Sequence, residues 1–457
     1  MPVYLIQPQD LLFFRDARPM EPESPGGGQG ARWPHPAIFF DAIHAALWRA
    51  FPDAEHRQRV GFAGRSFFLK RKGRRIAVRR QRTWFHTLAT AGPFPVVESR
   101  WLFPAPADVL PEGGRLLPIT EPSGVSIPPS ALRYALGSTE LPSKATVVPW
   151  WSKEAVEGYL ARGTGLPEGR TFGSSQLFAG EWTTGIGTDP LTDTQDGERI
   201  YSAQYLRLRE DVRFGLWATL PKNGPDGMDE MFPGSSDLAI LVAGGQQRFC
   251  HVQRQDADDD LTRLLPVSRP LPAGCTRLKW VLLSPAVFPS VPTQGHGGGW
   301  LPTWIHPGDH GVLLNPVGTD PAVRRRSRSE RRRAEPDPDL RRCRLVAARI
   351  PKPVPITGWT EALHVPRRDD QEQPIDGGRR PGPRATQLAV PAGAVYYFEC
   401  PTERAARLLW GLLSWHGDEA QRVNRIVHRR SSLLGEKGFG LGICSCWEAY
   451  ETMFGNR

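Results

Sequence analysis

Short apolar runs and one helical periodicity organise the first part of the chain. Residues 3–6 contain β-branched and aromatic side chains and predict a buried strand. After a glycine-rich loop, residues 36–51 place apolar side chains at helical spacing, and Pro36 suits the first turn of a helix. Residues 205–208 and 214–217 have the composition of two further strands.

The pattern partly restarts in the second half. Residues 238–252 predict a hairpin around a Gly-Gly pair, and the Pro-containing link 264–274 is the candidate domain boundary. The strand predicted over 278–283 precedes a proline, three glycines and a tryptophan, which is also the order at the start of the chain. This weak self-similarity suggests a duplicated module, although chance is an alternative because the chain has 47 glycines and 45 prolines.

The end of the chain reads as strand, helix, glycine-rich loop and strand. Residues 395–398 predict the first strand, residues 435–442 form the loop, and residues 443–450 predict a closing strand. Thr402 is placed to cap the helix, whose expected apolar face consists of Ala405, Leu408, Leu409 and Leu412. Residues 100–190 are rich in proline and glycine and predict a loop-rich insertion. Strands with few helices indicate an α+β fold.

The charge of the chain favours a polyanionic partner or an acidic protein surface. The formal net charge is +10, and the excess is clustered. Residues 65–82 hold nine basic residues beside aromatic ones, as expected of a groove for single-stranded RNA, whereas a solvated basic hairpin is the structural alternative. Residues 324–344 hold ten arginines without apolar anchors and predict a mobile loop.

The cysteine spacing and the hydropathy of the chain predict where in the cell the protein is found. The spacing of the six cysteines matches no paired zinc motif, so we expect reduced thiols in the cytoplasm. No run of about 18 apolar residues exists, so we expect no contact with a membrane. The first residues lack the pattern of a secretory signal.

Two segments suggest anion binding. In the loop 435–442, glycine amides can face a phosphate, Lys437 adds charge and Phe439 offers a ring for a base, but a tight turn explains the same pattern. Near the start, Asp16 can hold Arg15 or Arg18 and aim the other guanidinium at a phosphate. The alternative is a partly buried ion pair that ties the first strand to a loop.

Histidines give weak signals for chemistry. His306 and His310 have i, i+4 spacing, but the proline and glycine between them oppose a helical zinc site with His296. His35 is the one candidate general base for RNA cleavage, with packing as the favoured alternative. No nucleophile elbow, HExxH motif or catalytic carboxylate pair is present.

Several ordered motifs resemble one family, the third subunit of the type III-B (Cmr) CRISPR effector complex, a RAMP-superfamily protein. The resemblance covers the opening from Tyr4 through Arg15 and Asp16 to Pro19, the glycine-rich segment that ends at Trp33-Pro34, and Gly92-Pro93-Phe94. It continues in residues 181–187, where Trp182 and Thr183 depart from the family pattern, in residues 390–398, and in the terminal Gly438-Phe439-Gly440-Leu441-Gly442.

The resemblance implies an α+β fold of two tandem ferredoxin-like (RRM-like) RAMP domains with loop-rich insertions. The expected domains are 1–268, with the insertion at about 100–190, and 272–457, with the glycine-rich loop at 435–442 and the mobile arginine-rich loop at 322–344. It further implies a subunit that is not an enzyme, needs no cofactor or metal, and binds the 5′ handle of the CRISPR RNA.

Contacts with the large polymerase-like (cyclase-like) subunit and with the backbone RAMP subunits are also implied. The rival interpretation is a metal-independent RAMP endoribonuclease that processes CRISPR RNA. The expected RNA-binding residues are Arg15, Asp16, Arg18, Gly27, Gly28, Arg32, Trp33, Gly185, Gly187, Lys437, Gly438, Phe439, Gly440 and Gly442.

Overall fold

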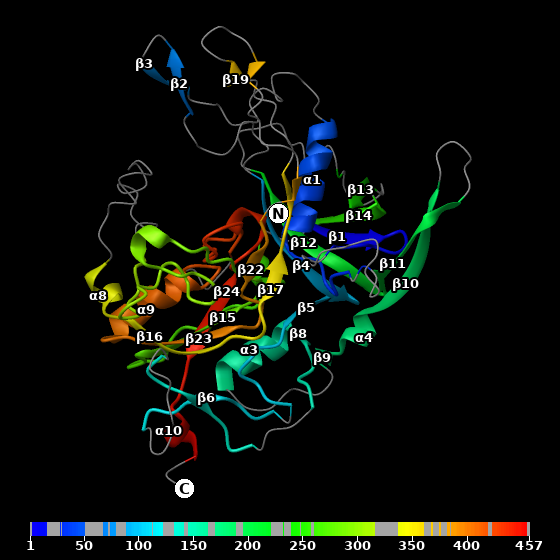
Figure 1. Cartoon of the computed structure of the whole chain (residues 1–457). Coiled ribbons are helices and arrows are strands. Elements are labelled where there is room, and N and C mark those ends of the chain that lie inside the picture. Colours follow the sequence, from blue (N-terminus) through cyan, green and yellow to red (C-terminus); the bar gives the residue numbers. More distant parts are fainter. Residues whose placement is uncertain are drawn as a thin grey trace.

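Two antiparallel sheets, one from each half of the chain, form the centre of the protein (Figure 1). The computed structural model describes residues 2–15, 28, 30–50, 67–71, 74–78, 88–111, 113–121, 132–140, 145–162, 170–188, 195–220, 232, 239–246, 248–256, 260–315, 337–360, 367–368, 374–375, 382–383, 385–418 and 423–454.

The first sheet has eight strands in the order β13-β14-β1-β12-β4-β5-β8-β9. Its strands are β1 (Pro2–Pro8), β4 (Ala89–Val97), β5 (Arg100–Pro104), β8 (Trp150–Ser152), β9 (Thr171–Phe172), β12 (Val212–Thr219), β13 (Ala239–Ala243) and β14 (Arg248–Asp256). In β1 the side chains of residues 3 to 6 are all buried, because helix α1 (Ala37–Ala50) covers one face and the second half of the chain covers the other.

The second sheet has four strands in the order β16-β23-β15-β24. They are β15 (Arg277–Leu282), β16 (Arg344–Arg349), β23 (Val395–Glu399) and β24 (Gly442–Cys446). Helix α9 (Glu403–Leu413) packs on this sheet and begins as predicted, because the Thr402 hydroxyl accepts a hydrogen bond from the Ala405 amide at 3.2 Å. Its buried Leu409 stabilises the packing by roughly 1.5–3 kcal/mol.

The same strand order occurs in both sheets. If the four central strands are counted in chain order, β14-β1-β12-β4 and β24-β15-β23-β16 both run 4-1-3-2, with every neighbouring pair antiparallel. Helix α1 lies between the first and second strands of the first sheet, and α9 lies between the third and fourth strands of the second. The link 264–274 lies between the last strand of one sheet and the first strand of the other.

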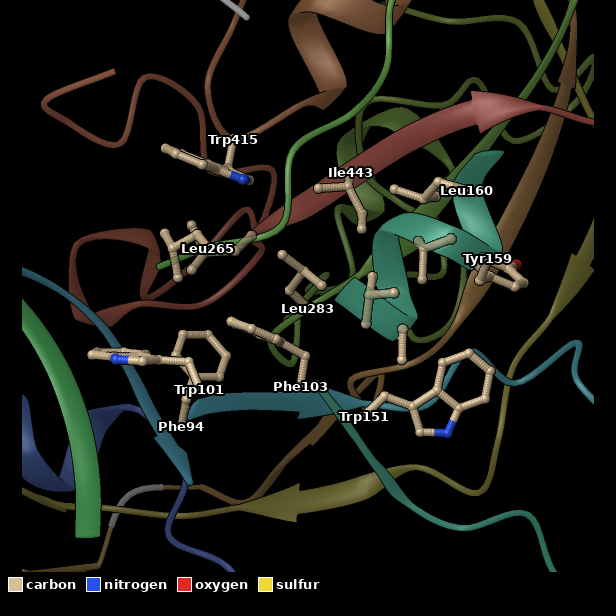
Figure 2. Close-up of a cluster of buried hydrophobic side chains, with 14 of the residues drawn as sticks. Phe94, Trp101, Phe103, Trp151, Tyr159, Leu160, Leu265, Leu283, Trp415 and Ile443 are labelled. Carbon is tan, nitrogen blue, oxygen red and sulfur yellow. The ribbon is translucent and has the colours of Figure 1, made fainter. Parts of the chain in front are cut away.

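One apolar core joins the two sheets. Figure 2 shows this cluster, in which Phe94 and Phe103 of the first sheet lie near Leu283 and Ile443 of the second half. A separate core lies between the first sheet and α1, and another lies between the second sheet and α9. The two sheets therefore share buried surface rather than standing apart.

The remaining described elements are short ribbons and helices. The two-stranded ribbons are β2 (Phe67–Arg71) with β3 (Arg74–Val78), β6 (Leu117–Pro118) with β7 (Leu136–Gly137), β10 (Phe178–Thr188) with β11 (Gln195–Leu208), β17 (Val354–Ile356) with β22 (Gln387–Ala389), β18 (Trp359–Thr360) with β21 (Gly382–Pro383), and β19 (Arg367–Arg368) with β20 (Pro374–Ile375). The helices are α3 (Lys153–Arg162), α4 (Ser174–Leu177), α8 (Pro338–Arg341), α10 (Tyr450–Phe454) and the 3-10 turns η2 (Leu261–Arg263), η3 (Pro292–Gln294) and η4 (Gly435–Lys437).

Three expectations about elements need correction. Residues 100–190 supply β5, β8, β9 and α3 to the body, and strands of two to five residues are too short to show a sequence period. The closing strand ends at Cys446 rather than continuing to residue 450, because its partner β15 begins at Arg277. The end of the arginine-rich segment forms α8 and the start of β16, while its residues 324–336 lie outside the described residues.

The expectation of reduced thiols is wrong for one pair. Cys275 and Cys446 form a disulfide across 171 residues, because the pairing of β15 with β24 brings them together. The other four cysteines are free and buried. None of the described helices has the length and apolar character needed to cross a bilayer.

Candidate nucleic-acid interface

The opening segment and the glycine-rich segment lie along strand β11. Leu12 and Leu206 exchange two backbone hydrogen bonds of 2.9 and 2.8 Å. The amide of Gly28 donates to the carbonyl of Ser202 at 2.6 Å, and Arg15 is paired with Gly30. Two segments that the sequence singled out are therefore fixed side by side by main-chain bonds.

Glycine is required at position 30 by the chain itself. A Cβ added there would lie 2.4 Å from the carbonyl oxygen of Gln204, which leaves no space for a side chain. At Gly30 the close approach is made by strand β11, whereas the predicted approach of RNA at Gly27 and Gly28 stays a prediction.

Arg15 and Arg32 present exposed side chains from this segment. No described carboxylate forms an ion pair with either of them. Asp16, Arg18 and Gly27 lie outside the described residues, so the proposed pairing of Asp16 with an arginine stays a prediction. An exposed guanidinium without a carboxylate partner is a candidate for binding an anion.

Trp33 supports the fold rather than offering a free ring. Its indole packs on Phe214, with the ring centroids 4.9 Å apart, and also contacts Trp150 and Phe178. The Nε1 atom donates to the carbonyl of Pro93 at 3.0 Å. These contacts favour a supporting role for Trp33 over stacking with a base.

The β10–β11 ribbon extends away from the body (Figure 1). Gly185 lies opposite Tyr201 within this ribbon, and Gly187 lies in the irregular stretch of β10, so both belong to a strand and not to the loop that we expected. On one face Trp182 lies opposite Gln204, and the hydroxyls of Thr184 and Ser202 are 3.3 Å apart.

Sequence reasoning did not select Trp182 as a site residue. Its side chain is 50% exposed, which is unusual for a large apolar ring. The only signal in the sequence was its departure from the family pattern. On the opposite face of the ribbon, Arg207 donates to Glu181 at 2.7 Å and lowers the pKa of that carboxyl. Trp182 therefore lies on the face away from this ion pair.

The glycine-rich loop at 435–442 is packed against its surroundings, and its expected role as an anion cradle stays a prediction. The amides of residues 437 to 441 all donate within the chain, for example Gly440 to the carbonyl of Pro285 at 2.8 Å. Phe439 is 0% exposed, so its ring is unavailable to a base. Lys437 pairs with Asp41 and lies 4.9 Å from the Phe40 ring.

The glycines of this loop allow close packing, mostly within the second half of the chain. A Cβ on Gly440 would lie 2.0 Å from the amide nitrogen of Ser431, and one on Gly442 would lie 2.0 Å from Nε1 of Trp280. Gly438 has a φ of +99° and faces the carbonyl of Thr90 in β4. The lack of a side chain thus serves contact between the sheets at Gly438 and packing within the second half at Gly440 and Gly442, and the amides of residues 437 to 441 all donate within the chain.

His35 lies against the same loop, with its ring centroid 6.2 Å from that of Phe439. Burial lowers its pKa to about 4, while the negative charge of Asp41 acts in the opposite direction. Its Nδ1 atom is buried and has no hydrogen-bond partner among the residues that the structure describes. His35 is neutral at pH 7 and is a weak base, since a general base works best with a pKa near the working pH.

The described residues contain no cluster of three potential metal ligands. His296 is occupied by bonds to the carbonyl of Pro302 and the amide of Gly298, and His306 lies 3.0 Å from Asp309. His296 and His306 therefore make separate internal contacts.

The model of a protein family described as "CRISPR-associated protein (Cas_Cmr3)" matches residues 4–442, which is nearly the whole chain. The chain belongs to this family. The match confirms the resemblance drawn from the ordered motifs. No curated protein matches the chain.

Solved structures of type III complexes are distantly similar to this Cas_Cmr3 chain. A chain of "Cryo-EM structure of the Type III-B Cmr-beta bound to cognate target RNA and AMPPnP, state 1" is 12% identical, with a TM-score of 0.36 and 86% of each chain covered. A chain of "Crystal structure of Csm3-Csm4 subcomplex in the type III-A CRISPR-Cas interference complex" is 10% identical, with a TM-score of 0.34 and coverage of 88% and 94%.

Within this Cas_Cmr3 protein, the expected site residues fall into two groups. The opening segment and the β10–β11 ribbon present exposed cations, hydroxyls and an indole. The glycine-rich loop is closed by its own contacts. The first group is therefore the better candidate for contact with a nucleic acid.

Proposed function

We propose that this Cas_Cmr3 protein is a non-catalytic RNA-binding subunit of a type III-B effector complex and holds the 5′ handle of the CRISPR RNA. The family match over residues 4–442 is the observation that carries the proposal. In this role it contacts the large polymerase-like subunit and the backbone RAMP subunits.

The ribbon β10–β11 and the segment beside it suit single-stranded RNA. Arg15 supplies a guanidinium for a phosphate, and Trp182 supplies an exposed ring on which a base can stack. Hydroxyl and amide groups of Ser202 and Gln204 lie on the Trp182 face and can bond the edges of an unstacked base. Affinity then comes from phosphates and specificity from bases.

We also infer that the two sheets are two ferredoxin-like units. The repeated 4-1-3-2 order and the antiparallel pairing support this inference, because a split β-α-β arrangement produces that order. One crossover helix of each unit is described, α1 in the first and α9 in the second. The restart of the sequence pattern near residue 278 is then the start of the second unit.

The test measures binding of a labelled guide RNA with its 5′ handle to the full chain across a range of salt concentrations. The variant Arg15→Ala with Arg18→Ala should bind more weakly, and its salt slope should fall by about 0.7 for each lost phosphate contact. Arg404→Ala with Arg407→Ala is the matched control, because these arginines are also three apart and pair with carboxylates. Equal slopes for both double variants would remove Arg15 and Arg18 from the site.

A cleavage assay separates this proposal from the ribonuclease alternative. The chain is incubated with repeat RNA in EDTA, and the products are separated by size. We expect the RNA to stay uncut, because the low pKa of His35 makes its imidazole a weak general base. Single-site cleavage that is lost in His35→Ala would establish the enzyme instead.

A further inference from the structure

The hairpin formed by β13 and β14 exposes large apolar side chains. Ile240 is 62% exposed and Phe249 is 54% exposed. In the register of the hairpin Val242 lies opposite Phe249, and Ile240 lies opposite His251. Because side chains alternate along a strand, Ile240, Val242 and Phe249 share one face.

This face continues the buried face of the neighbouring strand β1. Leu5 lies opposite Gln253 of β14, and Val3 lies opposite Gln255. Both β1 side chains are buried in the core that joins the two sheets. The same sheet face is therefore covered at β1 and left open at β13 and β14.

The open face carries no formally charged side chain, although the chain has a net charge of +10. Its outward positions are Ile240, Val242, Phe249, His251, Gln253 and Gln255. A nucleic-acid surface needs lysines and arginines, whereas the centre of a protein interface is depleted of charge and enriched in aromatic residues. The chemistry of this face fits an uncharged, apolar protein surface.

The free edge of the sheet adds a second requirement. β13 is the last strand in the sheet order, and no hydrogen bond joins its outer edge to another described segment. An exposed edge strand without lysine or proline pairs readily with other strands, so native proteins cover or interrupt such edges. Residues 239–243 contain neither.

We infer that the outer face and free edge of the β13–β14 hairpin dock an extended, uncharged apolar strand of another protein subunit. Strand addition supplies main-chain hydrogen bonds at β13, and the partner's side chains cover Ile240 and Phe249. That this partner is a subunit of the same effector complex rests on the proposed function. RNA binding plays no part in the inference.

The test uses the full chain co-expressed with each other subunit of its complex, and measures co-purification and affinity. Ile240→Lys with Phe249→Lys should lower the affinity for one subunit by about tenfold or more. Leu388→Lys is the matched control, because Leu388 is 56% exposed in the separate ribbon β17–β22. Ile240→Thr with Phe249→Thr, which keeps β propensity, guards against misfolding of the lysine variant.

Two results would overturn the inference. Undiminished affinity of both double variants for every subunit would show that the face is not a docking site. Self-association of the chain alone, abolished by the double variants, would assign the face to a second copy. Hydrogen exchange of the amides at 239–243 should slow in the complex, and unchanged exchange would reject strand addition.

Guide-RNA binding, measured separately, is expected to be the same in wild type and in the double variants. A wild-type chain that binds its subunit through this face but binds no guide RNA would refute the proposed function alone. If the double variants no longer bind the subunit but bind guide RNA normally, the result supports the inference that this face docks the subunit.

Discussion

Replacement of Gly440 by alanine tests whether the glycine-rich loop is a packed junction or an open anion site. Gly440 has a φ of +77°, a conformation that costs an L-residue about 1–2 kcal/mol. A Cβ would also lie 2.0 Å from the amide nitrogen of Ser431, so the backbone must shift. Overpacking of this kind costs about 1–3 kcal/mol. The expected total is about 2–5 kcal/mol of lost stability.

Two other glycines separate these contributions. Gly299 has a similar φ of +71°, but a Cβ added there would meet no heavy atom within 4 Å, so Gly299→Ala should cost only the conformational strain of about 1–2 kcal/mol. Gly297 has open space and no left-handed φ, so Gly297→Ala should leave stability nearly unchanged. The excess cost of Gly440→Ala over Gly299→Ala measures the close approach itself.

The assay is urea unfolding followed by circular dichroism, with guide-RNA affinity measured on the folded variants. Gly440→Ala should shift the midpoint furthest and leave the affinity of the folded protein unchanged, because the loop amides already donate within the chain. A Gly440 variant as stable as the Gly299 variant, but with weaker RNA binding, would refute this reasoning. The loop would then be an anion site after all.

Exposed and buried side chains give three further predictions. Trp182→Ala should weaken guide-RNA binding, measured by fluorescence anisotropy, by about 1–3 kcal/mol. Trp300→Ala, which also changes a surface tryptophan, should leave the affinity unchanged. Equal losses of affinity in the two variants would contradict a specific stacking role for Trp182. Burial lowers the pKa of Lys279 to about 7 in the folded chain. Between pH 7 and 10.5 the unfolded chain therefore binds more protons than the folded chain. The free energy of unfolding should rise with pH over this range, by at most ~1.4 kcal/mol per pH unit. Lys279→Met should remove that rise, and a wild-type profile as flat as that of the variant would reject the shift. Tyr397→Phe removes a 2.8 Å hydrogen bond to buried Asp108 and should cost about 1–3 kcal/mol in calorimetry; an unchanged transition would show that the bond contributes nothing.

The sequence predicted elements whose pattern is local. The cap at Thr402 and the helix after it are confirmed, because the capping bond and the apolar periodicity lie within one short segment. The hairpin around Gly244 and the strands near residues 3 and 278 were found for the same reason. The disulfide between Cys275 and Cys446 was missed, since only the pairing of distant strands brings the two sulfurs together.

The role of the glycine-rich segments could not be derived from the sequence, because glycine gives the same signal for two different causes. Close packing within the protein accounts for glycine at position 30, beside Gln204, and at positions 440 and 442, beside Ser431 and Trp280. A nest for phosphate needs the same absence of a side chain. Composition cannot separate these causes, because the deciding atoms come from other parts of the chain.

A cluster of buried polar groups holds the two sheets together. Asp108, from the first half, accepts hydrogen bonds from Tyr159 and Tyr397 and lies 3.8 Å from Nζ of Lys279 in β15. A buried charge persists only where it is paired, and removal of one partner of such a pair typically costs about 3–5 kcal/mol.

The glycine-rich loop makes a second junction between the same two sheets, through Gly438 and the carbonyl of Thr90. Groups committed to these junctions cannot also bind a phosphate or transfer a proton to a ligand without separation of the two sheets. Exposed side chains outside these junctions remain available to a ligand. Among the described residues these include Arg15 beside β11 and Trp182 on the β10–β11 ribbon.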